Sequence, residues 1–132
     1  MKYPDWQERL VRTLQAAKMR PFSWGEHDCA LFAADCVQAM CGEDFAAVYR
    51  GTYDSRIGAK KALLKHHGTL ENALCACMDQ VPIKLLQRGD VAVMNNGGNR
   101  CAGIVWSNGV YCAGDTGLVL LRDRPLSVWR VR

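Results

Sequence analysis

The sequence predicts an α+β fold in which a helical half precedes a small antiparallel β-sheet. Up to about residue 82, apolar side chains recur at the three- and four-residue spacing of amphipathic helices. From Asp90 onward they alternate at every second position, which is the period of a strand. Helices grouped before antiparallel strands are typical of the α+β class. The chain has 132 residues and no linker or repeat, so we expect one domain over residues 1–132.

The central helix is predicted at residues 28–41, and the strands are expected to pack against it. Asp28 is a typical N-cap residue and Gly42 a typical helix stop. Cys29 therefore occupies the first position of a mostly buried helix. The helix dipole is expected to lower the pKa of a thiol there, and the thiolate is the nucleophilic form. The apolar face consists of Cys29, Phe32, Ala33, Cys36, Val37 and Met40.

Other helices are predicted around the central one, over residues 5–19, 43–49, 55–66 and 70–78. Asp5 and Glu8 resemble a capping box at the start of the first of these helices. Ser55 and Thr69 are N-cap candidates for the last two.

Five strands are predicted in the second half, over residues 90–94, 101–106, 110–113, 117–121 and 127–131. Residues 95–99, which are rich in Asn and Gly, are expected to form a loop. Asn108-Gly109 is a strong hairpin signal, and a two-residue turn there would place Val105 opposite Cys112. Because side chains alternate along strands, Cys101, Val105 and Cys112 would then share one sheet face.

Composition argues against several classes of protein. The net charge is +4, but the basic residues are scattered, which favours a solvated surface over a nucleic-acid interface. No apolar run resembles a signal peptide or approaches the length of a membrane span. We therefore expect a cytoplasmic protein, as synthesised, with no membrane partner. The seven cysteines are then expected to be reduced thiols.

Four motifs occur in a recognisable order along the chain. Trp-Gly at residues 24–25 precedes Asp-Cys at 28–29, and Gly-Asp-Val at 89–91 precedes Cys-Ala-Gly-Ile at 101–104 and a hairpin. This order resembles the NlpC-type branch of the papain-like cysteine peptidases, which cut peptide crosslinks in bacterial cell walls. The resemblance covers roughly residues 21–131 and implies a papain-like fold, with the small sheet packed on the central helix.

The resemblance also implies roles for particular residues. Cys29 falls at the position of the nucleophile, Cys101 at that of the base histidine, and Cys112 near that of the residue that orients the base. A cysteine peptidase needs a base that takes the thiol proton and later protonates the leaving amine. An aligned cysteine cannot do this at neutral pH, so the resemblance implies a site that has lost its base. His27, on the loop before Cys29, is the alternative base candidate.

Three further segments look closer to one set of relatives. They are Ala-Ala-Asp-Cys-Val at residues 33–37, Arg-Gly-Thr-Tyr at 50–53 and Ala-Gly-Asp-Thr-Gly-Leu at 113–118. They resemble small NlpC-type proteins that are encoded beside phage and prophage tail genes and lack the histidine. That resemblance implies a non-catalytic tail-region protein with a structural or assembly role. Its partners would be phage tail proteins or cell-wall peptide, and it would be associated with the virion tail.

Two alternatives stay open. The first is a thiol hydrolase acting on peptidoglycan peptides or a related amide, with Cys29 as nucleophile and a backbone N–H at the helix start as oxyanion donor. The second is a soft-metal or redox site formed by Cys29, Cys101 and Cys112. The paired Cys-x-x-Cys spacing of zinc sites is missing, so no cofactor or metal is expected, and buried free cysteines also act simply as small hydrophobes.

Overall fold

The computed structural model describes residues 1–132 and contains four α-helices and one six-stranded antiparallel sheet, which confirms the α+β class. The helices are α1 (Trp6–Ala17), α2 (Cys29–Cys41), α3 (Arg56–His66) and α4 (Leu70–Leu74). A short 3₁₀ helix, η1 (Ile83–Leu85), follows β1. The strands are β1 (Met78–Val81), β2 (Val91–Asn96), β3 (Asn99–Trp106), β4 (Gly109–Gly114), β5 (Gly117–Leu121) and β6 (Ser127–Val131), in the sheet order β1-β6-β2-β3-β4-β5.

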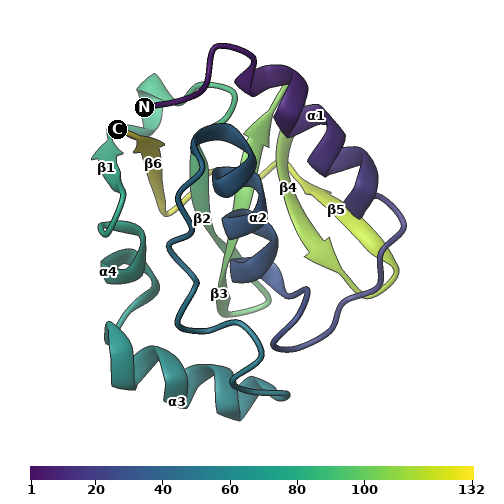
Figure 1. The fold of residues 1–132 in the computed structure, drawn as a ribbon, viewed down its shortest axis with the longest axis vertical. Coiled ribbons are helices and arrows are strands. Elements are labelled where there is room, and N and C mark those ends of the chain that lie inside the picture. Colours follow the sequence, from purple (N-terminus) through teal and green to yellow (C-terminus); the bar gives the residue numbers. More distant parts are fainter.

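Helix α2 lies across the middle of the sheet, in front of β2, β3 and β4 (Figure 1). Helix α1 covers the β4–β5 end, whereas α3 and α4 lie at the opposite side of α2 (Figure 1). The two termini lie close together at one corner, and the Tyr3 N–H donates to the Met40 carbonyl at 2.8 Å. No helix combines the length and the apolar character that crossing a membrane requires.

Helix α2 is the central helix that the sequence predicts. The Asp28 carboxylate accepts from the Leu31 N–H at 3.0 Å, and Gly42 ends the helix with φ +82°. Seven of its residues are buried: Leu31, Phe32, Ala33, Ala34, Cys36, Val37 and Met40. The helix is therefore enclosed on most of its circumference, and its first residue is held at a fixed place.

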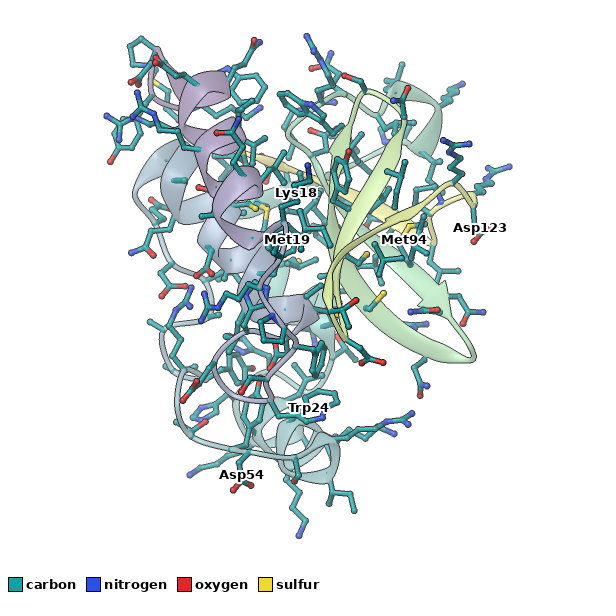
Figure 2. All side chains as sticks on the ribbon, turned by 90° about the vertical axis from the view of Figure 1, so that its right-hand side faces the viewer. Lys18, Met19, Trp24, Asp54, Met94 and Asp123 are labelled. Carbon is teal, nitrogen blue, oxygen red and sulfur yellow. The ribbon has the colours of Figure 1, made fainter.

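Side chains of the sheet divide between two apolar clusters. Residues that point toward α2, such as Val93 and Ile104, belong to a main core of 24 buried residues. Residues at the alternate positions form a second cluster of six buried side chains: Ala92, Met94, Cys101, Val105, Val110 and Cys112. In Figure 2, where the helices lie to the left, Met94 lies on the right-hand side of the sheet.

Helix α1 is amphipathic, as predicted, and buries Leu10, Leu14 and Ala17. The capping box predicted at its start is wrong. The Asp5 side chain accepts no backbone N–H and pairs with Arg9 at 2.8 Å instead. A guanidinium one helical turn away thus competes successfully with the backbone for this carboxylate.

Two predicted helices are wrong in extent or in kind. The predicted helix at 43–49 is absent and residues 45–50 form successive turns, because the Asp44 carboxylate accepts from the Ala46 N–H at 3.0 Å and also binds Arg50 at 2.8 Å. Helix α4 ends at Leu74 rather than near residue 78. Met78 instead starts β1 and pairs with Val131, so pairing with a distant strand overrides local helix preference.

The predicted hairpin details also change. Trp106 pairs with Gly109 and Val105 with Val110, so the turn is Ser107-Asn108 and the predicted register is wrong by two residues. A shift of two residues leaves every side chain on its original face. The loop predicted at 95–99 is shorter than expected, because β2 and β3 meet at a two-glycine turn, 97–98, with φ +61° and +84°.

Candidate functional site

A cleft of about 440 Å³ lies between the start of α2, the segment 45–53 and α3, and it reaches β3. Two of the candidate cysteines, Cys29 and Cys101, line it. The aromatic side chains of Trp24, Tyr49 and Tyr53 also contribute to its walls. Figure 2 shows Trp24 at the end of the molecule where α3 lies. The cleft is therefore mostly apolar, with thiols at the junction of helix and sheet.

Basic side chains supply most of the charge in the cleft. Arg56 and Lys60 come from α3, and Arg100 comes from β3. Arg100 forms an ion pair with Glu71, whereas Arg56 and Lys60 have no acidic partner. The α3 wall therefore presents two unpaired positive charges.

Asp28 fixes the loop that leads into α2. Besides capping Leu31, its carboxylate accepts from the Gly25 N–H at 3.2 Å and from the Tyr53 hydroxyl at 2.6 Å. Gly25 has φ +82°, and a Cβ there would lie 1.9 Å from the Tyr53 carbonyl oxygen. Asp28 thus holds three elements together, and it sets the position of Cys29 without being a proton donor to it.

The three candidate thiols converge, as the shared face predicts. Cys101 Sγ lies 3.9 Å from Cys112 Sγ. Cys29 packs against the second cluster, which contains both of these residues, and its Sγ lies 3.7 Å from the Ala113 carbonyl oxygen. Cys101 and Cys112 are 7% and 2% exposed, so the cluster opens to the outside mainly through Cys29 and the cleft.

The convergence depends on a break in the sheet. Pairing of β3 with β4 stops at Ile104 and Tyr111, whereas β4 continues to pair with β5 as far as Gly114. Beyond Ile104 and Tyr111 no ladder pairing joins β3 to β4, which leaves room between these two strands for the sulfur atoms. A Cβ at Gly103 would lie 2.6 Å from Cys112 Sγ, so the missing side chain at Gly103 provides the space that the thiol fills.

The negative charge of the thiol cluster is most favourable at Cys101. Hydrogen bonds from the Cys112 thiol, and then from the Cys29 thiol, hold the pKa of Cys101 well below that of an ordinary thiol, although burial opposes this. Interaction with Cys101, reinforced by burial, raises the pKa of both Cys29 and Cys112. The expectation of a lowered pKa at Cys29 is wrong, because a neighbouring sulfur charge and burial outweigh the helix dipole.

No histidine lines the cleft. His27 is 1% exposed, neither ring nitrogen has a hydrogen-bond partner, and its ring packs edge-on against Phe32 at 5.9 Å. Burial, and then the charge of Arg20, lower the pKa of His27, which keeps the ring neutral. His66 and His67 lie at the end of α3 and contact the Tyr49 ring instead. The sequence-based candidate His27 is therefore not placed beside Cys29 as a base.

No group of three or more His, Cys, Asp or Glu side chains has the arrangement needed to hold a metal ion. The structure therefore gives no support to the soft-metal alternative for the three thiols. Asp35, on α2, is neutralised by Arg50 at 2.8 Å and takes no part in the cleft.

The sequence pattern did not identify the tyrosines of the cleft. Tyr53 belongs to the Arg-Gly-Thr-Tyr segment, which served only as part of a resemblance, and Tyr49 lies in the wrongly predicted helix. They line the same cleft as Cys29 because the segment 45–53 passes beside the start of α2, where the Tyr53 hydroxyl donates to Asp28. Two tyrosines placed two residues before and two residues after Gly51 were the one local signal available.

Comparison with known proteins gives one family assignment. A search of curated proteins finds no match to the chain. One family model, described as a domain of unknown function, DUF6950, matches residues 1–131. Because the match extends over nearly the whole chain, the protein belongs to the DUF6950 family.

Proposed function

We propose that this protein is a non-catalytic phage or prophage tail-region protein, built on a degenerate papain-like fold of the NlpC type. The observation that carries the proposal is the position of Cys101. Its thiol interacts with Cys29 at the place where the resemblance puts the base histidine. The contact between the helix bearing Cys29 and the strand bearing Cys101 supports a peptidase-like origin in which a second thiol replaces the base.

The chemistry of this replacement argues against peptide hydrolysis. A peptidase base must accept the proton of the nucleophile and then return it to the leaving amine. The pKa of Cys29 is raised by its sulfur neighbour, so little thiolate forms at the nucleophile position near neutral pH. The pKa of Cys101 is lowered, so the Cys101 thiolate is a weak base. It is too weak to take the proton from Cys29 and deliver it to a leaving amine.

The cleft is suited to holding a ligand without cleaving it. Its walls carry four aromatic rings, and α3 adds the positive charges of Arg56 and Lys60. Aromatic side chains supply large contact areas at a small cost in conformational entropy. We propose that the cleft binds an extended segment of a tail protein or a cell-wall peptide, and that this contact serves tail structure or assembly.

Loss of catalysis is tested by incubating the protein with purified peptidoglycan and with soluble muropeptides, followed by mass spectrometry of the products. We expect no more released peptide than with the Cys29→Ala variant. Release by the unmodified protein that disappears in Cys29→Ala would contradict the proposal and favour the thiol hydrolase. The Cys101→His variant is the matched gain-of-function test, because it restores a base at the proposed position.

The tail assignment is tested through the gene and the particle. We expect tail genes on both sides of the gene, and we expect its deletion to reduce the number of complete tailed particles seen by electron microscopy. A gene that stands among metabolic enzymes, with no tail genes nearby, would contradict the assignment.

A further inference from the structure

Cys101 and Cys112 form a contacting pair within the thiol cluster. Their sulfur atoms are 3.9 Å apart, and a disulfide requires about 2.05 Å. The two residues lie beyond the last residues that pair β3 with β4, Ile104 and Tyr111, so no ladder pairing joins the two strands there, although β2 still holds Cys101 and β5 still holds Cys112 on the outer edges. Closing the remaining gap therefore requires side-chain rotation and a small approach of β3 and β4 at a point where they do not pair with each other.

The two sulfurs differ in access. Cys101 lines the cleft, so a small oxidant can reach it from solution. Cys112 is 2% exposed, does not line the cleft and has its Sγ over the bare Cα of Gly103. An oxidant that enters through the cleft therefore meets Cys101 before Cys112. This arrangement combines an accessible thiol with a sheltered one in contact with it, which is what a two-thiol redox site requires.

We propose that Cys101 and Cys112 form a peroxide-sensitive pair that closes to a disulfide and thereby frees Cys29 from its thiol neighbour. This site is independent of the proposed tail function. The lowered pKa of Cys101 supports the order of events, since the thiolate is the form that reacts with peroxide.

The reaction has two balanced steps. The Cys101 thiolate attacks one oxygen of hydrogen peroxide, the O–O bond breaks, and the products are Cys101 sulfenic acid and hydroxide. The Cys112 thiol then attacks the sulfenic sulfur, the S–O bond breaks, and the products are a Cys101–Cys112 disulfide and water. The two sulfurs lose two electrons in total, and these reduce the peroxide.

Closure has a consequence for Cys29. Interaction with Cys101 is the largest cause of the raised pKa of Cys29, and burial is the second. A disulfide sulfur carries no charge and donates no proton, so closure removes the first cause and leaves the second. The thiol at the start of α2 then becomes more reactive, because the helix dipole is no longer opposed by a neighbouring thiolate.

The experiment uses the full chain with the exposed thiol replaced, Cys75→Ser, so that intermolecular disulfides do not form. The protein is titrated with hydrogen peroxide, alkylated, digested and mapped by mass spectrometry. We expect one intramolecular disulfide that joins Cys101 to Cys112, with a mass loss of about 2 Da for two hydrogens. Absence of a disulfide after peroxide treatment, or a disulfide that joins Cys29 to Cys101, would overturn the proposal.

Two variants sharpen the test. In Cys112→Ala the Cys101–Cys112 disulfide cannot close, and we expect Cys101 to accumulate as a sulfenic acid that dimedone traps. The matched control is Cys36→Ala. Cys36 is also a buried thiol but lies on α2, so its removal should leave the Cys101–Cys112 disulfide unchanged. If peroxide oxidises the same number of thiols in Cys112→Ala as in Cys36→Ala, the assignment of the pair is overturned. If Cys112→Ala does not fold, the disulfide map of the parent protein decides alone.

The last readout is the rate at which iodoacetamide labels Cys29 at pH 7. We expect the rate to rise at least tenfold after disulfide closure, which corresponds to a fall of about one unit in the thiol pKa. Cys101→Ser, in which the neighbour cannot ionise, should show a similar increase without peroxide. An unchanged rate in both cases would overturn the coupling between the pair and Cys29.

Discussion

The cleft has two unlike walls, the helices α2 and α3. Both begin with a side-chain cap, Asp28 on α2 and Ser55 on α3. Helix α2 buries seven residues, whereas α3 buries none and exposes Ile57 by 69% and Leu64 by 71%. The comparison teaches that a cap defines where a helix starts, while burial decides how firmly the helix is held.

The attachment of α3 rests on few contacts. The Tyr49 ring packs against His66 and His67, and the Tyr49 hydroxyl hydrogen-bonds His67 Nδ1. Leu63 reaches the main core only as a half-buried side chain. Segments with few buried apolar contacts open locally at a lower free energy than the core. One wall of the cleft is therefore fixed and the other is able to adapt to a ligand.

The largest effect is expected on the fixed wall. Phe32 is 0% exposed and packs in the main core, so Phe32→Ala leaves a large cavity. We expect the free energy of unfolding to fall by about 3–5 kcal/mol. Denaturation by guanidinium chloride, followed by circular dichroism, measures this change. A loss below about 1 kcal/mol would contradict the rigid-wall description, because it would mean that α2 relaxes around the cavity.

The next effect concerns the hydrogen bonds of Asp28. In Asp28→Ala the Leu31 N–H loses its cap and the Tyr53 hydroxyl loses its acceptor. We expect the free energy of unfolding to fall by about 2–3 kcal/mol, from the loss of a cap and of a buried acceptor together. Ser55→Ala is the matched cap variant on α3. Equal losses of global stability in the two variants would contradict the difference between the walls.

The local features of both walls were predictable from sequence. The caps at Asp28, Ser55 and Thr69 each bond an N–H three residues ahead, and a signal of that range is contained in the sequence around it. Convergence of the thiols was predictable too, even with a wrong register. The period of a strand is two, so a slip of two residues keeps Cys101 and Cys112 on one face.

Features that depend on distant partners were not predictable. Strand β1 exists because Met78–Val81 pairs with β6, and no nearby residue signals this pairing. The turns at 45–50 depend on Arg50, which binds both Asp44 and Asp35. The raised pKa of Cys29 likewise comes from Cys101, on a strand far along the chain. A rule based on the helix dipole alone considers only the local charge, and for that reason it failed here.

Buried His27 should make the stability of the protein depend on pH. The pKa of buried His27 is lowered, so the unfolded chain takes up a proton near pH 6.5 that the folded protein takes up only at lower pH. The unfolded state then binds more protons, and the free energy of unfolding falls as the pH drops from about 6.5 toward the pKa of folded His27. Denaturation midpoints measured from pH 8 to pH 5 test this. The fall in the free energy of unfolding at low pH should disappear in His27→Gln and persist in His66→Gln. The same pH dependence in both variants would contradict the role of His27.

The smallest effect is expected at the exposed face of α3. Leu63 and Leu64 are adjacent and chemically identical, but Leu63 lines the cleft and Leu64 is 71% exposed. Leu64→Ser should change the free energy of unfolding by less than about 0.5 kcal/mol. Leu63→Ser should instead speed hydrogen exchange of the α3 amides, because it removes an apolar contact between α3 and the main core, while exchange in α2 stays slow. Were α3 and α2 to exchange at the same slow rate in the unmodified protein, α3 would open only with global unfolding. The cleft would then have two rigid walls, and its ligand would have to fit a preformed shape.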